Sequence, residues 1–328
     1  MIHLKNTIVK TTEETAPEDE TLMELYLSSD LTLPFKDRRI SDRRASGGMG
    51  GRRASDREIP DRRKTRTCDM KKITVLIPCY NEEEGIGKVI DDVPKEKLAH
   101  LGYQTEIIVI NNNSKDRTSK IAHEKGIRVI SEKKQGKGNA IKTGFSNISN
   151  DTDYVVMIDG DNTYKAKEIP RLIELLEDNF CDAVIGSRLE GKLKEASLSF
   201  SHRLANWFFT FLVRRFYFVN VTDTCTGYFA WKKKVVDELK PYLKSEGFAI
   251  ETEMITKMAK LGYQVFSVPI TYDIREGSSK LSPYIDGIKI VWMLIKNMSW
   301  NPRKRAIQNY SRQYDKYLDA SKQADAKV

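Results

Sequence analysis

Two aspartates, Asp159 and Asp161, are the residues whose type and spacing point most directly to chemistry. They come at the end of an apolar run that begins at Tyr154. Carboxylates two positions apart at the end of a strand can point to the same side of the chain. Such a pair can hold Mg²⁺ or Mn²⁺, which complete their coordination shell with water and phosphate oxygens. We therefore predict a divalent metal site that neutralises the charge on a departing diphosphate.

Three other polar clusters also follow apolar runs, and they give the aspartate pair its context. The clusters are Pro78–Glu83, Asn111–Asp116 and Gln135–Asn139. In open parallel sheets, ligands bind outside the carboxyl ends of the strands. An Asp-x-Asp sequence recurs by chance, but four clusters at equivalent positions describe one crevice, and this favours the metal interpretation.

The elements that position these clusters alternate along the chain from Lys72 onward. The expected strands are Ile73–Pro78, Glu106–Ile110, Ile127–Ser131, Tyr154–Asp159 and Ala183–Ser187. The expected helices run to about Val93 and over Ser114–Lys125, Gly138–Ile148 and Lys167–Asn179. Continuously apolar strands that alternate with helices indicate βαβ units. We predict an α/β fold with a mostly parallel central sheet and helices on both of its faces.

The first 70 residues are predicted to form a disordered tail. The chain has 328 residues and a net charge of +9, and residues 36–66 alone hold 12 basic and 5 acidic side chains with few large apolar ones. Such a segment cannot bury enough surface to offset its chain entropy. An Arg-rich block attracts anionic surfaces, either lipid head groups or nucleic acid.

The number and spacing of the cysteines indicate the redox environment in which the chain works. The four cysteines form no Cys-x-x-Cys pair, and the chain shows no apolar signal segment near its start. This argues against a disulfide framework and a zinc site and favours a reducing, cytoplasmic environment.

Two stretches are apolar enough to contact a membrane, Leu204–Val221 and Gly287–Met298. The first is interrupted by Arg214 and Arg215. As a helix the second is about 18 Å long, short of the roughly 30 Å hydrocarbon core. We expect no transmembrane segment, but an interfacial helix over residues 283–300 at the cytoplasmic face of a membrane. The alternatives are packing in the core or a homo-oligomer interface. Residues 301–328 read as a polar tail.

Taken together, the motifs between about Ile73 and about Ile290 resemble glycosyltransferase family 2, the enzymes of GT-A fold. The likeness is strongest to polyprenyl-phosphate (dolichyl-phosphate) mannose and glucose synthases. It rests on IPCYNEEEGI, NNNSKDRT, GKGNAIKTG, MIDGDNTY, DAVIGSR, VTDTCTGYFAW, GFAIETEM and REGSSKLS. The resemblance implies a GT-A domain over residues 71–282. It also implies an inverting, metal-dependent transfer of a hexose from a UDP- or GDP-sugar to a polyprenyl phosphate.

The resemblance also assigns roles to single residues. It places metal binding on Asp159 and Asp161, which are counted as catalytic together with Arg188, Arg203 and Asp223. The two arginines match residues that hold the acceptor phosphate, for which a guanidinium fork is suited. Nucleotide-sugar binding falls on Pro78, Tyr80, Glu82, Asn111, Asn112, Lys137, Gly138, Asp159, Arg275 and Lys280.

The chain departs from the family at one informative place. Family members usually carry Asp-Asp or Asp-Asn where this chain has Asn111 and Asn112. An asparagine can hydrogen-bond a base or ribose but carries no charge. The base preference is therefore left open. A chain disabled at this point and acting as a scaffold is one alternative, against which the intact Asp-x-Asp argues.

The acceptor decides whether a base is needed. A phosphate monoester is already an anionic nucleophile, so positioning and charge stabilisation of the leaving diphosphate would suffice. A saccharide hydroxyl would need a general base, for which Asp223 is the candidate, and this family 2 reaction is a second hypothesis. A third is a nucleic-acid-binding protein that uses residues 36–66. Stacking platforms and groove-reading helices are not evident, and no nucleic acid partner is expected.

Overall fold

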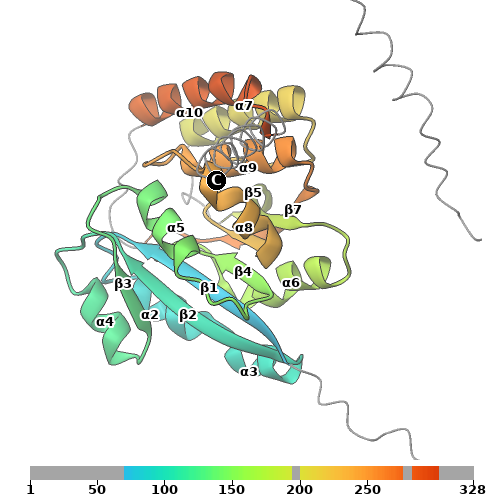
Figure 1. Ribbon diagram of the computed structural model, residues 1–328. Helices are drawn as coiled ribbons and strands as arrows, with labels where there is room; N and C mark the ends of the chain where they lie inside the picture. The colour runs from blue at the N-terminus through green and yellow to red at the C-terminus, as the bar shows by residue number, and fades with distance from the viewer. Residues whose placement is uncertain (1–69, 194–199, 276–282, 303–328) are drawn as a thin grey trace, which may run out of the picture. The chain divides into compact units, whose positions relative to one another are not determined.

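The computed structural model describes residues 70–193, 200–275 and 283–302 (Figure 1). The predicted disordered tail falls outside these ranges except for its last residue. Lys280 and almost all of the predicted polar tail also lie outside them. These predictions stay untested.

Seven strands of the described chain form one sheet, in the order β3-β2-β1-β4-β6-β5-β7. Neighbouring strands are parallel except at β6, which runs antiparallel to both β4 and β5. The predicted α/β class with a mostly parallel sheet is confirmed. The strands are β1 (Lys71–Cys79), β2 (Tyr103–Asn111), β3 (Arg128–Ser131), β4 (Tyr154–Met157), β5 (Ala183–Leu193), β6 (Phe229–Lys232) and β7 (Val265–Tyr272).

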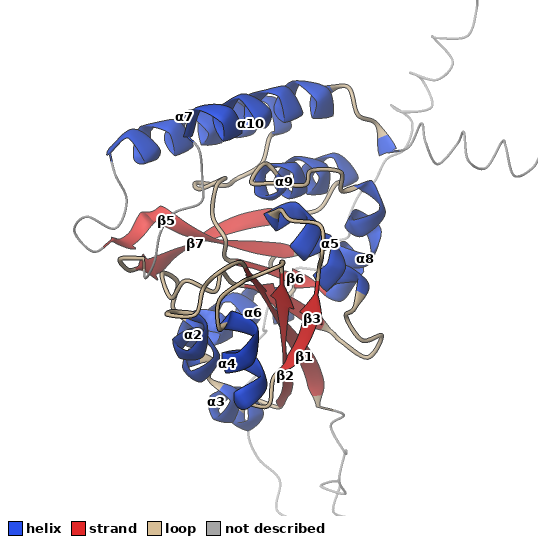
Figure 2. Ribbon diagram, turned by 90° about the vertical axis from the view of Figure 1, so that its left-hand side faces the viewer, coloured by secondary structure: helices blue, strands red, loops and turns tan. Residues whose placement is uncertain are grey.

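Helices cover both faces of this sheet (Figure 2). One face carries α2 (Ile86–Asp92), α3 (Lys95–His100), α4 (Thr118–Glu124) and α6 (Ile169–Glu177), the last preceded by the 3₁₀ turn η1 (Ala166–Glu168). The other carries α5 (Lys137–Ser146), α8 (Lys233–Leu239) with the turn η2 (Lys240–Tyr242), α9 (Ile250–Leu261), α7 (Phe200–Tyr217) and α10 (Pro283–Met298). The helices α7 and α10 lie side by side as the outermost layer, over α9.

The central strand β1 shows why the apolar runs are continuous. Its residues Ile73, Val75 and Ile77 belong to the core under α2, α4 and α6. Leu76 belongs to the separate core under α5 and α9. Because both faces of the strand are covered, no alternation of apolar and polar residues is possible. The burial of these side chains is the main favourable term that fixes the sheet.

Two strands were not predicted, and one of them shapes the site. The short strand β6 pairs antiparallel with β4, so that Phe229 lies opposite Met157. The loop before β6 is thereby returned to the carboxyl end of β4. Strand β4 also ends at Met157, so Asp159 stands two residues beyond it and not at the end of the predicted strand Tyr154–Asp159. Helix α7 begins before the apolar stretch Leu204–Val221 and ends within it, at Tyr217.

Among the described residues, no helix is both long enough and apolar enough to cross a membrane.

Candidate active site

A cavity of about 210 Å³ opens at the carboxyl ends of β1, β2 and β4, beside the start of α5. Eight predicted site residues line it: Pro78, Tyr80, Glu82, Asn112, Lys137, Asp159, Asp161 and Arg275. The predicted crevice therefore exists and gathers residues from segments almost 200 positions apart. Asn111, Gly138, Arg188, Arg203 and Asp223 do not belong to this lining, and Lys280 lies outside the described residues.

Asp161 is buried and fixed in the turn that follows β4. Its Oδ1 accepts a hydrogen bond from the Thr163 amide at 3.1 Å and another from the Thr163 hydroxyl at 2.6 Å. Asn162 adopts a left-handed conformation with φ of 61°, which an asparagine tolerates better than most residues. The other oxygen, Oδ2, lies 3.0 Å from Nη1 of Arg275. The carboxylate thus points into the cavity with one oxygen committed to the turn.

Asp159 is held by Lys137 on one side and by close packing on the other. Its Oδ1 lies 2.7 Å from Nζ of Lys137. A Cβ placed on Gly227 would stand only 2.0 Å from Oδ2 of Asp159. No side chain fits there, so glycine at the loop before β6 leaves the space that the carboxylate occupies. The Gly227 amide is in turn fixed by donating to the hydroxyl of Tyr164 at 2.8 Å.

Lys137 joins two carboxylates. Its Nζ is 2.7 Å from Asp159 and 2.6 Å from Oε1 of Glu251, a residue in the first turn of α9. Burial by itself would lower the pKa of the Lys137 ammonium, but the two carboxylates outweigh burial and hold that pKa above its ordinary value. The side chain is therefore a permanent cation. The preceding Gly136 has φ of 131°, a conformation suited to glycine, and begins α5 at the cavity.

Arg275 ties the first loop to the aspartate turn. Its Nη2 lies 2.6 Å from Oε1 of Glu82, while its Nη1 reaches Asp161. Its Nε is buried and has no hydrogen-bond partner among the described residues. A buried donor without an acceptor costs free energy, so a ligand that supplied a hydrogen-bond acceptor here would be favoured.

We call the residues Glu82, Lys137, Asp159, Asp161, Glu251 and Arg275 the cavity cluster. It sets four carboxylates against two cations, an excess of two negative charges when all groups are ionised. One divalent cation would remove that excess. Among the described residues, no group of three or more His, Cys, Asp or Glu side chains is arranged to hold a metal. A cation bound by the two aspartates would therefore take its remaining ligands from water or a ligand.

The asparagines that replace the family's acidic residues support loops. The Asn112 side chain donates to the Lys134 carbonyl at 2.8 Å and accepts from the Gly136 amide at 2.7 Å. Asn111 accepts from the Ser114 amide at 3.0 Å. Asn112 also lines the cavity, where its amide is partly engaged by the backbone. Their part in base recognition stays a prediction.

Two further predicted residues, Arg188 and Asp223, form a separate cluster together with Asn206, which was not predicted, and we call it the Arg188 cluster. Arg188 grips Asp223 with two nitrogens, Nε to Oδ2 at 2.7 Å and Nη2 to Oδ1 at 2.9 Å. Asn206 donates to the same Oδ1 at 2.7 Å. Asp223 is fully buried, and both oxygens are engaged. The prediction that Asp223 serves as a base for a hydroxyl acceptor draws no support from this arrangement.

Arg203 is not brought to either cluster. It lies exposed near the start of α7. The adjoining helix layer therefore carries this arginine at its surface, and its predicted role with the acceptor phosphate is not tested by the geometry.

Several residues of the site were not predicted. Ala140, Gly160 and Phe248 also line the cavity, and so do Cys79, Gln135 and Gly136, which lie within the predicted polar clusters but were given no role of their own. The GFAIETEM segment holds two glutamates. Glu251 pairs with Lys137 of the site, whereas Glu253 pairs with Lys257. The signal that could have selected Glu251 is its spacing of four from Ile255 and seven from Met258, both fully buried.

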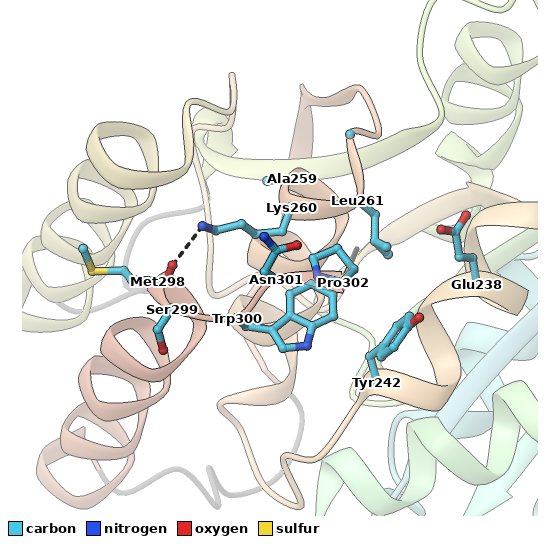
Figure 3. A pocket seen from close by; sticks show the side chains of 11 residues that line it. Glu238, Tyr242, Ala259, Lys260, Leu261, Met298, Ser299, Trp300, Asn301 and Pro302 are labelled. Atoms are coloured by element: carbon cyan, nitrogen blue, oxygen red, sulfur yellow. Dashed lines mark hydrogen bonds between the residues drawn. The ribbon is translucent and has the colours of Figure 1, made fainter. Parts of the chain in front are cut away.

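A larger hollow of about 620 Å³ lies elsewhere, between η2 and the ends of α9 and α10 (Figure 3). Lys260 donates across it to the Met298 carbonyl at 2.9 Å, and the ring of Trp300 meets that of Tyr242 edge-on at 5.1 Å. Its one carboxylate, Glu238, accepts a hydrogen bond from Tyr263. Glu238 and Lys260 are the charged residues of its described lining, and each is engaged by a different partner. The cavity at β1 and β4 is therefore the better candidate for chemistry.

The mostly parallel sheet with a crevice at its strand ends has the architecture of the GT-A fold. Residues 74–240 match Glycosyl transferase family 2, and the chain belongs to that family. The predicted family and enzyme class are confirmed: the chain is a glycosyltransferase.

Relatives of known name support this assignment. The Haloferax volcanii protein named low-salt glycan biosynthesis hexosyltransferase Agl6 is 30% identical over 226 residues, which are 69% of this chain and 53% of that protein. The chain thus spans about half the length of that relative. A dolichyl-phosphate hexose transferase of the same organism is 29% identical over 68% of this chain and 92% of the relative.

A solved structure confirms the fold. Glucosyl-3-phosphoglycerate synthase from Mycobacterium tuberculosis, solved with Mn²⁺, UDP and phosphoglyceric acid, superposes with a TM-score of 0.55. The match covers 70% of this chain and 79% of that chain, at 21% identity. At this identity the comparison establishes the shared GT-A architecture.

Proposed function

We propose that this chain transfers a hexose from a nucleotide-sugar to a polyprenyl phosphate, with a divalent cation held by Asp159 and Asp161. The observation that carries the proposal is the excess of carboxylates in the cavity cluster. Three acidic side chains, Glu82, Asp159 and Asp161, line the cavity, and a fourth, Glu251, pairs with Lys137 behind it, whereas the cluster holds only two cations. Such an imbalance is costly in a buried place unless a further cation completes it.

The residues present fit a hard divalent cation. Asp161 is already oriented by Thr163, and Gly227 leaves room for the carboxylate of Asp159. Oxygen ligands of this kind suit Mg²⁺ and Mn²⁺. When bound, the cation would supply charge stabilisation to the leaving diphosphate. The relative of similar architecture, solved with Mn²⁺ and UDP, supports the same proposal.

The chain's own cations would share that work. Lys137 at the start of α5 and Arg275 at the far wall flank the cavity from opposite elements. The Nε of Arg275, which has no hydrogen-bond partner in the described part of the chain, offers a donor to a phosphate oxygen. Tyr80 and Phe248 provide the aromatic walls against which a base would pack. Preorganised charges of this kind need no reorganisation when the diphosphate departs.

A phosphate acceptor agrees best with the rest of the site. A phosphate monoester needs no general base, and Asp223, the candidate base, is buried and saturated by hydrogen bonds. The relative named as a dolichyl-phosphate hexose transferase matches this chain over most of its own length. Arg203, which is exposed near the start of α7, remains a proposed contact of the acceptor phosphate. Arg188 is buried and engaged by Asp223, so its predicted contact with that phosphate draws no support from the arrangement.

The acceptor's membrane would meet the outer layer formed by α7 and α10. On α10 an apolar stripe of Ile285, Ile288, Trp292 and Ile295 is about 60–70% exposed. The opposite side of that helix, with Ile290, Met293 and Leu294, is buried in the core. Core packing therefore accounts for one side of the helix and leaves the other unpartnered among the described residues.

Charge on this outer layer favours a lipid surface as its occupant. On α7, Trp207, Phe208 and Phe211 are exposed, and Arg214 and Arg215 follow one turn later. On α10 the Nζ of Lys296 lies 4.6 Å from the ring centroid of Trp292. Aromatic and apolar side chains flanked by cations suit the interface of an anionic bilayer. Contact at the cytoplasmic face stays a prediction.

Vesicle binding tests the membrane contact. We expect the chain to sediment with vesicles of phosphatidylglycerol and less with phosphatidylcholine. The double substitution Ile288→Ser and Trp292→Ser should reduce vesicle binding about tenfold or more, because it removes apolar area that the bilayer would bury. Ile290 is not changed, since it is part of the core. If the chain instead forms a dimer that these changes dissociate, and binds no vesicles, the layer is an oligomer interface.

Release of nucleoside diphosphate tests the reaction. A panel of UDP- and GDP-sugars is offered with Mg²⁺ or Mn²⁺ and a short polyprenyl phosphate, and Asp161→Ala is the control. We expect lipid-dependent release that is abolished in the variant. Turnover only with a saccharide acceptor would replace the proposal by transfer to a hydroxyl. Failure to bind any donor would favour the scaffold hypothesis.

A further inference from the structure

Glu251 is the member of the cavity cluster that comes from helix α9, which covers the same face of the sheet as α5. It sits in the first turn of α9, and its side chain is 5% exposed. Its carboxylate lies 2.6 Å from Nζ of Lys137, and the same Nζ lies 2.7 Å from Asp159. The ammonium of Lys137 therefore stands between an aspartate that a metal would use and a glutamate that it would not.

We propose that Glu251 is a positioning residue that keeps Lys137 beside the diphosphate site when a divalent cation takes Asp159, and so sets the affinity for that cation. The inference rests on the proposed function, because it concerns the same metal site. It assigns a task to a residue that does not line the cavity and acts only through another side chain.

The physical reason is competition for one carboxylate. A divalent cation on Asp159 repels the Lys137 ammonium, which would otherwise keep its place through that aspartate. Lysine is a point charge on a flexible four-carbon stem and follows its strongest partner. Without Glu251 the ammonium would have Asp159 as its one carboxylate partner among the described residues, and it would stay there and oppose the metal. Glu251 supplies a second anchor at hydrogen-bond distance.

The position of Glu251 is fixed by packing on both sides of it. Its neighbours Ile250 and Met254 are fully buried in the core beneath α7 and α10. A carboxylate in such surroundings is costly unless it is paired, and Lys137 is its partner in an ion pair. The rigid start of α9 thereby fixes the place of a flexible lysine.

Glu253 provides a matched control on the same helix. It is equally buried and pairs with Lys257. Its Oε2 accepts a hydrogen bond from the backbone amide of Ser245 at 2.7 Å. Loss of its charge removes a buried ion pair of α9 without touching Lys137. Any effect common to the two glutamates is therefore structural.

The test measures Mn²⁺ binding to the full chain by electron paramagnetic resonance, without donor, and then kcat and KM for the donor. For Glu251→Gln we expect Mn²⁺ binding to weaken roughly tenfold, the range seen when groups behind metal ligands are lost, and kcat to fall more than KM rises. Lys137→Met should bind Mn²⁺ more tightly than the wild type, because the competitor for Asp159 is gone. In the Lys137→Met background, the further change Glu251→Gln should leave Mn²⁺ binding unaltered. Glu253→Gln should lower the melting temperature and keep Mn²⁺ binding within about twofold.

Equal weakening by Glu251→Gln in the wild-type and Lys137→Met backgrounds would overturn the inference, because Glu251 would then act by its own charge. Unchanged binding in Glu251→Gln would also overturn it. If Glu251→Gln does not fold, Lys137→Met decides alone: tighter binding supports the competition, and weaker or equal binding refutes it. Absence of Mn²⁺ binding in the wild type is a different failure, since it refutes the proposed metal site itself.

Discussion

The cavity cluster and the Arg188 cluster are both built from buried ion pairs, yet they differ in charge balance. In the Arg188 cluster one guanidinium meets one carboxylate with two parallel hydrogen bonds, and Asn206 adds a third. In the cavity cluster four carboxylates share two cations. A balanced and saturated pair specifies structure, whereas an unbalanced group facing a cavity is prepared for a further ligand. Charge balance therefore separates the two clusters by function more sharply than burial does.

Neutralising a carboxylate of the cavity cluster should break activity without harming the fold. For Asp161→Asn we expect sugar transfer to fall at least about 100-fold, since loss of the proposed metal ligand would cost several kcal/mol of charge stabilisation. The free energy of unfolding should change by less than about 1 kcal/mol, because the variant reduces an excess of negative charge. Transfer assays and urea unfolding of the same preparation check both. A large loss of stability would show that the cluster is structural.

The same kind of substitution in the Arg188 cluster should mainly reduce the stability of the fold. Asp223→Asn leaves the buried Arg188 guanidinium without its counter-charge, and breaking one partner of such a pair costs about 3 kcal/mol or more. For a domain of this size the melting temperature should fall by about 10 °C. Calorimetry measures the change, and Asp182→Asn, at a partly exposed pair with Lys232 and Lys234, is the control that should cost far less. A stable variant that has lost activity would instead place Asp223 in the chemistry.

A single methyl group at the metal site gives a smaller and more specific effect. Gly227→Ala places a Cβ where the carboxylate of Asp159 now lies, so one of the two must move. We expect the Mn²⁺ concentration for half-maximal transfer to rise about tenfold, as when groups behind metal ligands are disturbed. Gly247→Ala is the matched control, because a Cβ there meets no described atom within 4 Å. Equal behaviour of the two variants would remove Gly227 from the account of the site.

The sequence allows the first half of this fold to be predicted because its strands are buried on both faces and read as unbroken apolar runs. Strand β6 has only four residues and runs against its neighbours, and β7 includes Ser267 and Pro269 at the sheet edge. Neither gives a strong local pattern, and edge strands are where proline is tolerated. Local patterning therefore fails where pairing partners are distant along the chain.

The site divides in the same way. The place of Asp159 and Asp161 in the cavity could be predicted because they directly follow an apolar run, and their role as metal ligands stays a proposal. The contact of Lys137 with Glu251 joins residues more than 100 positions apart, and no spacing rule links them. The engagement of Arg188 by Asp223 was likewise hidden, although each residue had been noted for a different task. Residue types were thus predictable, and their partners required the fold.

The smallest expected effect is the pH dependence of the stability that the Arg188 cluster contributes. Burial opposes ionisation of Asp223, but the charge and hydrogen bonds of Arg188 outweigh it and lower the pKa of that carboxyl below its ordinary value. An acid with a lowered folded pKa adds stability above its unfolded pKa, about 3.8, and loses it as pH falls through the folded value. The stability difference between the wild type and Asp223→Asn should therefore stay constant from pH 8 to pH 5 and shrink only below about pH 3.8. Urea unfolding across this range measures it, and a difference that already declines between pH 7 and pH 5 would contradict a permanently ionised pair.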